Sequence, residues 1–240
     1  MSKVNPMQND KQIVEIYDDG RYLENNADWH SEDSPWKAGH IQQILSRNHI
    51  LPRTLCEVGC GAGEILRQLS LHYPDCRFSG YEVSQTAFEM CRARQAENIT
   101  FHMRDILTED SYFDCLMCID VFEHVENYFG FIRGLKSKAH YKIFHIPLDL
   151  HVVAILRESM MELRHKVGHI HYFSKRTALA TLEDCGLEIV DSFFTPHFIG
   201  RPANSLKERF KRIPRHILHG LSPELQAKIL GHSSLLVLAK

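Results

Sequence analysis

The residues with the clearest chemistry lie in a glycine-rich run from Glu57 to Gly63. Glycines occupy positions 59, 61 and 63, directly after the apolar segment 54–58. Glycine adopts the positive φ angles of tight turns, and its lack of a side chain lets a ligand lie against the main chain. Glu82 ends a short segment about 20 residues later, where nucleotide-binding folds place a carboxylate that accepts hydrogen bonds from ribose. Together these residues predict a site for a nucleoside-containing cofactor.

The spacing of the glycines separates two classes of cofactor. Dinucleotide-binding loops read Gly-x-Gly-x-x-Gly and hold a pyrophosphate, whereas this run reads Glu-x-Gly-x-Gly-x-Gly. The run resembles motif I of class I S-adenosylmethionine-dependent methyltransferases, whose cofactor has no phosphates. Residues 104–106 are similar to the adenine-binding pair of that family, residues 113–125 to its fourth strand and following loop, and residues 234–239 to its last strand. The resemblance therefore covers most of the chain and implies S-adenosyl-L-methionine as cofactor.

The resemblance also implies which residues bind that cofactor. Glu82 would accept hydrogen bonds from the ribose, Glu57 would contact the amino group, and Asp105 with Ile106 would hold the adenine. Lys37 could reach the methionine carboxylate, although a solvated lysine without a role explains it equally well. The expected cofactor-binding set is Lys37, Glu57, Gly59, Cys60, Gly61, Gly63, Glu82, Val83, Asp105, Ile106 and Ile119.

A second group with chemical potential, Asp120, Glu123 and His124, follows the apolar residues 113–119. Open α/β sheets place their active sites at the carboxyl ends of strands, and carboxylates with an imidazole can converge on one ion. Similar Glu-x-x-Glu-His sequences occur here in ubiquinone-pathway O-methyltransferases and in enzymes that methylate the 3′-end ribose of small RNAs, both of which resemble metal-assisted enzymes. The resemblance implies a divalent metal (Mg, Mn or Zn) held by Asp120, Glu123, His124 and His169. The alternative is a glutamate at a helix start and a histidine that lines the pocket without metal.

Without a metal, a histidine is the natural general base, because its pKa lies near neutrality. The candidates are His124, His145, His169 and His171. For each one, a hydrogen-bonded structural histidine is the alternative. Four aromatic residues could wall the acceptor pocket, although core packing explains the last equally well: Trp29, Trp36, Tyr172 and Phe173.

Alternating strand and helix patterns predict how these residues are positioned. They indicate an α/β fold with a doubly wound, seven-stranded, mostly parallel sheet, the Rossmann-like methyltransferase fold, with an N-terminal helical extension and a helical insertion before the last strand. The expected strands are 54–58, 77–81, 99–102, 113–119, 142–146, 187–195 and 235–239. The expected helices are 64–72, 85–95, 128–137, 151–164, 175–185 and 206–219.

The chain divides into an N-terminal arm with helices at 1–48 and a methyltransferase domain at 49–240, with an expected lid insertion at 196–233. Within the insertion, Leu206 begins an amphipathic helix that carries several basic residues, and Pro214 should kink or split it. We expect its apolar stripe to pack on the sheet or to cover the substrate. Peripheral contact with an anionic membrane is possible but less favoured.

Composition limits the remaining choices. The net charge of −2 gives no broad attraction to nucleic acid, and no apolar stretch approaches the roughly 20 residues of a membrane span. The polar N-terminus and seven scattered cysteines favour a cytoplasmic protein with reduced thiols. The leading interpretation is transfer of a methyl group to an O or N atom of a small-molecule acceptor. The alternatives are a ribose 2′-O-methyltransferase acting on RNA and a non-catalytic scaffold with the same fold, and the sequence does not indicate the oligomeric state.

Overall fold

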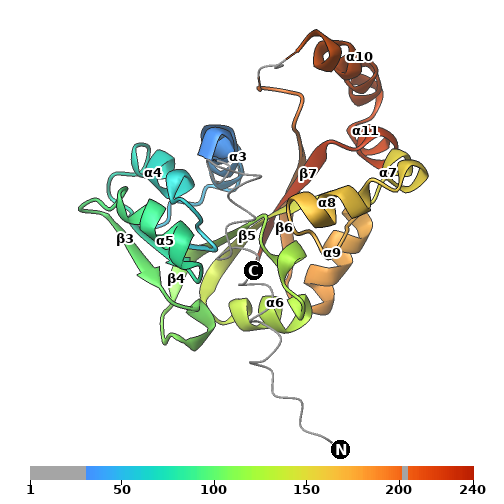
Figure 1. The fold of residues 1–240 in the computed structure, drawn as a ribbon. Coiled ribbons are helices and arrows are strands. Elements are labelled where there is room, and N and C mark those ends of the chain that lie inside the picture. Colours follow the sequence, from blue (N-terminus) through green and yellow to red (C-terminus); the bar gives the residue numbers. More distant parts are fainter. Residues whose placement is uncertain (1–30, 202–204) are drawn as a thin grey trace, which may run out of the picture.

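A computed structural model describes residues 31–201 and 205–240, and its centre is one seven-stranded sheet (Figure 1). Trp29 and the predicted polar arm lie outside the described residues. The strand order is β3-β2-β1-β4-β5-β7-β6; strands β1 to β5 are parallel, and β7 runs antiparallel to both β5 and β6. The strands are β1 Thr54–Val58, β2 Arg77–Glu82, β3 Ile99–Met103, β4 Phe113–Ile119, β5 Ala139–Pro147, β6 Ile189–Pro196 and β7 Ser233–Ala239. The predicted doubly wound, mostly parallel sheet is confirmed.

Helices cover both faces of the sheet. The α-helices are α3 Ser34–Arg47, α4 Glu64–Ser70, α5 Gln85–Arg92, α6 Tyr128–Lys136, α7 Val152–Arg157, α8 Met160–Lys166, α9 Lys175–Asp184, α10 Leu206–Leu221 and α11 Pro223–Leu230. Three short 3-10 helices complete the described elements: η2 Ser31–Asp33, η3 Ile106–Thr108 and η4 Phe122–His124.

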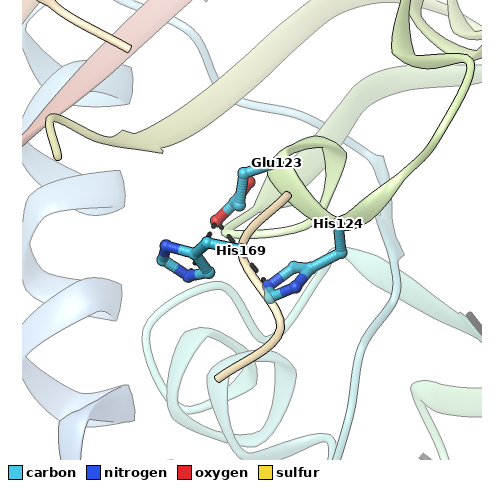
Figure 2. A group of neighbouring side chains, drawn as sticks. All are labelled: Glu123, His124 and His169. Carbon is cyan, nitrogen blue, oxygen red and sulfur yellow. Dashed lines mark ion pairs between the residues drawn. The ribbon is translucent and has the colours of Figure 1, made fainter. Parts of the chain in front are cut away.

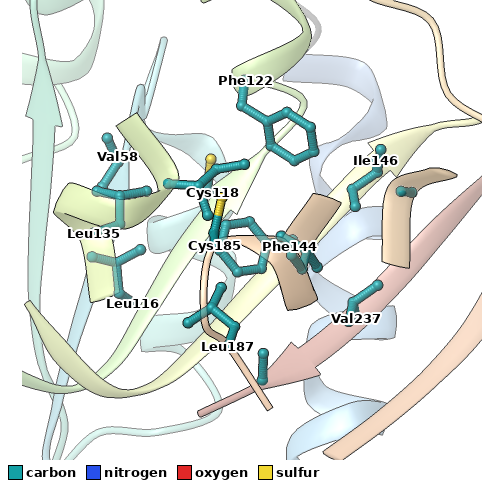
Figure 3. Close-up of a cluster of buried hydrophobic side chains, with 14 of the residues drawn as sticks. Val58, Leu116, Cys118, Phe122, Leu135, Phe144, Ile146, Cys185, Leu187 and Val237 are labelled. Carbon is teal, nitrogen blue, oxygen red and sulfur yellow. The ribbon is translucent and has the colours of Figure 1, made fainter. Parts of the chain in front are cut away.

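Two apolar clusters, one on each face, hold the layers together. One cluster joins α3, α4 and α5 to the sheet, and the other joins α6, α9 and η4 to the opposite face (Figure 3). Every residue of β7 is buried, because Leu235 and Val237 enter one cluster while Leu236 and Leu238 enter the other. This two-sided packing fixes the carboxyl ends of β1, β4 and β5 beside one another, since these strands are neighbours.

Two helix predictions differ from the structure. The segment expected as one helix at 151–164 is two helices, because Glu158 adopts a left-handed φ of 53° between them. Apolar periodicity does not detect a single residue of this kind. Helix α10 is not split at Pro214. Its apolar residues do not pack on the sheet either: Phe210, for example, is 71 % exposed, so that prediction is wrong.

Candidate functional site

A cavity of about 670 Å³ lies at the carboxyl ends of β1, β4 and β5. The glycine loop that follows β1 forms one wall through Gly59 and Gly61, and Ile119 lines the cavity beside it. Residues from α3, α7, α8 and α10 complete the walls. The cavity therefore occupies the place where the sequence predicts cofactor and acceptor.

The glycine loop has a backbone that other residues resist. Gly59, Gly61 and Gly63 have φ angles of 64°, 53° and 75°. A Cβ atom at Gly59 would lie 2.8 Å from the side chain of Val121, and one at Gly63 would lie 2.6 Å from the Phe101 ring. Gly63 caps α4 and does not line the cavity. Its glycine thus serves close packing of helix and strand, while Gly59 and Gly61 shape the cavity wall.

Glu82 holds the glycine loop to the end of β2. One carboxylate oxygen accepts a hydrogen bond from the backbone of Gly61 at 2.8 Å, and the other accepts from Val83 and Ser84 at 2.8 and 2.9 Å. The side chain is buried and does not line the cavity. The ribose contact of Glu82 remains a prediction, and the structure adds a role that the sequence did not indicate.

Glu57 is a buried carboxylate on the cavity wall, with 2 % of its surface exposed. Burial raises its pKa well above the usual range, and the charge of Lys37 offsets part of this effect. Its Oε2 atom has no hydrogen-bond partner among the described residues. A buried acceptor in this condition requires a donor. The ammonium group of S-adenosylmethionine is such a donor, so the residues present fit this cofactor.

The residues predicted to hold the adenine have other contacts. Asp105 accepts a hydrogen bond from the backbone of Leu107 at 2.9 Å and caps η3. Ile106 is fully buried in the core beneath it. Neither lines the cavity. A motif match locates Asp105 and Ile106 along the chain, but it does not show that the side chain of Ile106 is buried in the core.

Asp120 joins three elements through two short contacts. Its Oδ2 atom lies 2.8 Å from Nζ of Lys37 on α3, and its Oδ1 atom lies 2.6 Å from Nδ1 of His145 on β5. The other ring nitrogen of His145 lies 2.9 Å from the hydroxyl of Thr195. Burial opposes the ionised form of Asp120, but the charges of His145 and Lys37 hold its pKa well below the usual range.

These contacts bear on the roles predicted for His145 and Asp120. Both ring nitrogens of His145 are engaged, and the ring is 2 % exposed and off the cavity wall. His145 therefore contacts Asp120 and Thr195 rather than the cavity, and its role as a base stays a prediction. Because both carboxylate oxygens of Asp120 are already held, the structure leaves this residue out of the candidate metal cluster.

Glu123, His124 and His169 converge as predicted (Figure 2). One ligand atom from each lies within 4.8 Å of the others. The Oε1 atom of Glu123 is 4.0 Å from Nε2 of both histidines, and neither carboxylate oxygen accepts a hydrogen bond from the described part of the chain. Burial raises the pKa of Glu123 well above its usual range, and the nearby charge of Asp120 raises it further.

In both His124 and His169, the contact made by Nδ1 determines which ring nitrogen carries the lone pair. Nδ1 of His124 lies 3.0 Å from the carbonyl oxygen of Gly168, and Nδ1 of His169 lies 2.6 Å from a carboxylate oxygen of Asp149. Both partners are acceptors, so we assign the proton to each Nδ1 and the lone pair to each Nε2. Two lone pairs and a carboxylate then face one another, which calls for a shared cation or proton between them.

His171 takes no part in this group. Its Nε2 atom lies 3.0 Å from the backbone oxygen of Val125, its ring packs on Tyr128, and it is not on the cavity wall. Asp149, which orients His169, was not among the predicted site residues. The only sequence signal was its position just after β5, the third strand that ends at the cavity.

Comparison with known families decides the identity of the chain. Residues 29–192 match the profile of a family described as a methyltransferase domain. The chain belongs to this family. Comparison with curated proteins finds no match.

Solved structures that resemble this methyltransferase include enzymes with bound cofactor or cofactor product. Magnesium protoporphyrin IX methyltransferase from Synechocystis, with S-adenosylhomocysteine (SAH), is 16 % identical with a TM-score of 0.58, over 100 % of this chain and 89 % of that one. The plantazolicin methyltransferase BpumL, also with SAH, is 14 % identical with a TM-score of 0.57, over 96 % and 98 %. Coclaurine N-methyltransferase is 16 % identical with a TM-score of 0.57, over 84 % and 71 %. These likenesses show the fold, and with the family match they confirm a class I S-adenosylmethionine-dependent methyltransferase.

One of the four aromatic residues considered as pocket walls lines the cavity of the methyltransferase. Trp36 lines it and donates a hydrogen bond to the backbone oxygen of Ile199 at 3.0 Å. Phe173 belongs to the core, and Tyr172 donates to the backbone oxygen of Met160. Sequence reasoning missed the basic residues on the outer wall, which are Arg157, Lys166, Arg201 and Arg215. They come from separate segments, so no motif groups them.

His197, also missed, should make the stability of the methyltransferase fall in acid. It lines the cavity, packs edge-on against Trp36, and its pKa falls to about 3 because of burial and the neighbouring charge of His145. Below its unfolded pKa near 6.5, the unfolded chain takes up a proton that the folded chain refuses, so stability falls as pH falls. From about pH 6.5 to 5.5 this residue should cost roughly 1 kcal/mol of unfolding free energy.

Denaturant titrations across this pH range test the expectation by comparing wild type with His197→Gln, which cannot titrate. The wild-type free energy of unfolding should fall more steeply with acid than that of the variant. Parallel pH profiles would contradict it.

Proposed function

We propose that this methyltransferase transfers a methyl group from S-adenosyl-L-methionine to an O or N atom of a small-molecule acceptor, activated by Glu123, His124 and His169. The observation that supports this best is the group of three ligand atoms at the edge of the cavity: His124 and His169 line it, and the buried carboxylate of Glu123 behind them lacks a hydrogen-bond donor among the described residues. A cavity of about 670 Å³ has the size of a cofactor and a small acceptor together.

The reaction asks little covalent chemistry of the protein. The methyl of a sulfonium is already activated, so the enzyme must align donor and acceptor and take a proton from the acceptor. The glycine loop and Glu57 would hold the donor. His124 and His169 line the same cavity, which supports one of them as the proton acceptor.

Glu123, His124 and His169 fit a divalent metal. Asp149 and the carbonyl of Gly168 orient the two imidazoles, as carboxylates and carbonyls do behind histidine ligands. When bound, such a metal would lower the pKa of an acceptor hydroxyl and polarise it. Without metal, Nε2 of His169 or His124 is the base, and the Asp149 carboxylate would stabilise the protonated His169.

Metal titration of chelator-treated protein tests this assignment without an acceptor. We expect Mn²⁺ or Zn²⁺ to bind and to release protons, with affinity that rises with pH, because protons compete for Glu123 and the imidazoles. Glu123→Gln should weaken binding by about tenfold or more. Calorimetry in buffers of different ionisation enthalpy reports both affinity and proton release.

Glu162→Gln is the matched control, since Glu162 lines the cavity but is exposed and outside the cluster. If no ion binds, or if both variants bind equally, the metal version is discarded. The base version then requires that His169→Asn lowers turnover while the affinity for SAH stays near that of wild type.

A ribose 2′-O-methyltransferase acting on RNA is the second candidate. It is supported by the same cluster and by the basic residues on the outer wall, among them Arg157 and Arg215. The net charge of −2 speaks against it. Titration with short single-stranded RNA at several salt concentrations separates the two, because only an RNA enzyme should bind with a steep salt dependence.

The domain boundaries and the lid belong to the same proposal. Arg201 and Arg215 bring the segment 196–233 to the cavity, which supports a covering role for it. Lys37 brings α3 to the same cavity from the region 1–48. The seven cysteines are free and buried, in keeping with a cytoplasmic location.

A further inference from the structure

Helix α10 is amphipathic with the usual orientation reversed. Its large apolar residues recur at helical spacing and are 51–78 % exposed: Leu206, Phe210, Ile213, Ile217 and Leu221. At 3.6 residues per turn they share an arc of about 80°. We call these five residues the apolar stripe. In Figure 1 the helix stands away from the sheet, next to α11.

The opposite face of α10 is polar and turns toward the protein. Arg212 donates hydrogen bonds to the backbone oxygens of Arg201 and Phe198 at 2.6 and 3.5 Å and pairs with Glu208. The rings of His216 and His219 pack edge-on against Phe198. These contacts fix the rotation of the helix and keep its apolar stripe outward.

Other exposed apolar side chains lie on α7 and α8. Helix α11 packs against both α10 and α7. Helix α7 carries Ile155 and Leu156, and α8 carries Met161, all with more than half of their surface exposed. An exposed apolar surface on this scale marks a contact with a partner rather than with water.

The charge of α10 selects the partner. The helix contains five of the 28 lysines and arginines of the chain and one of its 30 acidic residues, so it carries +4 on a chain of −2. Arg209 flanks the apolar stripe, and Lys211 lies beyond its edge; both are exposed. Long basic side chains beside an apolar face suit a lipid interface, where the chains bury their stems and the charges meet anionic headgroups. Two copies of α10 face to face would bring like charges together.

We propose that the apolar stripe of α10 docks on an anionic membrane surface, lying in the interface without crossing it. Among the described residues no helix is both long and apolar enough to span a bilayer. Arg215, on the inner face of α10, lines the cavity. Docking therefore brings the outer wall of the cavity to the membrane.

Vesicle cosedimentation with the full chain tests the proposal. Wild type should bind vesicles of phosphatidylcholine with about one third phosphatidylglycerol, should bind pure phosphatidylcholine about tenfold less, and should be released by salt. Phe210→Ser with Ile217→Ser should reduce binding to anionic vesicles about tenfold or more. The matched apolar control is Leu51→Ser, because Leu51 is 84 % exposed on the loop before β1.

A charge series separates the two contributions. Arg209→Gln with Lys211→Gln should weaken binding and flatten its salt dependence, whereas Arg92→Gln, an exposed change on α5, should do neither. Thermal unfolding confirms that the variants fold. Absence of wild-type binding to anionic vesicles overturns the proposal, as does equal binding by the stripe variant. The proposal is also overturned if the wild type is a dimer that does not bind vesicles and the stripe variant is a monomer, because the apolar stripe then contacts a second copy of the chain.

Discussion

Asp120→Asn should lower the free energy of unfolding by about 3 kcal/mol, because it breaks a buried ion pair and leaves Lys37 charged without its partner. Asparagine tolerates the left-handed φ of 54° at this position, so the change removes charge and not backbone fit. Lys37 has only 14 % of its side chain exposed, so water compensates poorly for the lost carboxylate there. Denaturant unfolding at neutral pH measures the difference.

The pH dependence gives a second readout of the same residue. The pKa of Asp120 is held well below its usual range, so its stabilisation is present above the unfolded value near 3.8 and is lost as pH falls further. Glu109→Gln is the control, since its partner Arg104 is 66 % exposed and such pairs contribute less than about 1 kcal/mol. Equal losses in the two variants would show that Asp120 is not part of a buried network.

Gly61→Val should weaken the binding of SAH by about 100-fold or more. The left-handed φ of Gly61 costs a β-branched residue roughly 1–2 kcal/mol, and displacing its backbone from Glu82 removes a charge-assisted hydrogen bond worth about 1.5–3 kcal/mol. The new side chain also enters the wall of the cavity. A variant loop that relaxes must restore this backbone on binding, at a cost of about 2.5–5 kcal/mol, which is comparable to the roughly 2.7 kcal/mol that 100-fold in affinity requires.

Calorimetry with SAH measures this effect, and the melting temperature shows whether the variant remains folded. Gly39→Ala is the matched control, because a Cβ at Gly39 on α3 meets nothing within 4 Å. It should bind like wild type. An affinity for Gly61→Val within a factor of about two of wild type would remove the glycine loop from the cofactor site.

Local patterns predicted the parts of the site that depend on local structure. The turn at Gly59 and Gly61 was predicted from a strand, closely spaced glycines and a helix start that follow one another directly. The sheet was predicted from the alternation of strand and helix patterns along the chain. Asp149 was not predicted as a site residue, because its contact with His169, 20 residues later, depends on how α7 and α8 return the chain to the cavity. The choice between His169 and His171 also needed the fold, since two histidines separated by one residue face different neighbours.

The exposed apolar stripe of α10 shows a different limit of prediction from sequence. Periodicity identified an amphipathic helix but could not indicate which face turns inward. The inner face carries Arg212, which donates to backbone oxygens of the segment around Phe198, and His216 and His219, whose rings pack against Phe198. The same pattern therefore describes a helix that covers a core and one that leaves its apolar face outside.

The contact between Lys37 and Asp120 couples two equilibria: the packing of α3 against the protein and the ionisation of Asp120 on the cavity wall. Detaching α3 removes one of the two positive charges, those of His145 and Lys37, that keep Asp120 ionised, and protonating Asp120 removes the partner that holds Lys37. By thermodynamic reciprocity each event favours the other to the same degree. If the cofactor carboxylate recruits Lys37 as predicted, it would compete with Asp120 for it, and the affinity of this methyltransferase for its cofactor would then include part of the free energy that holds α3 in place.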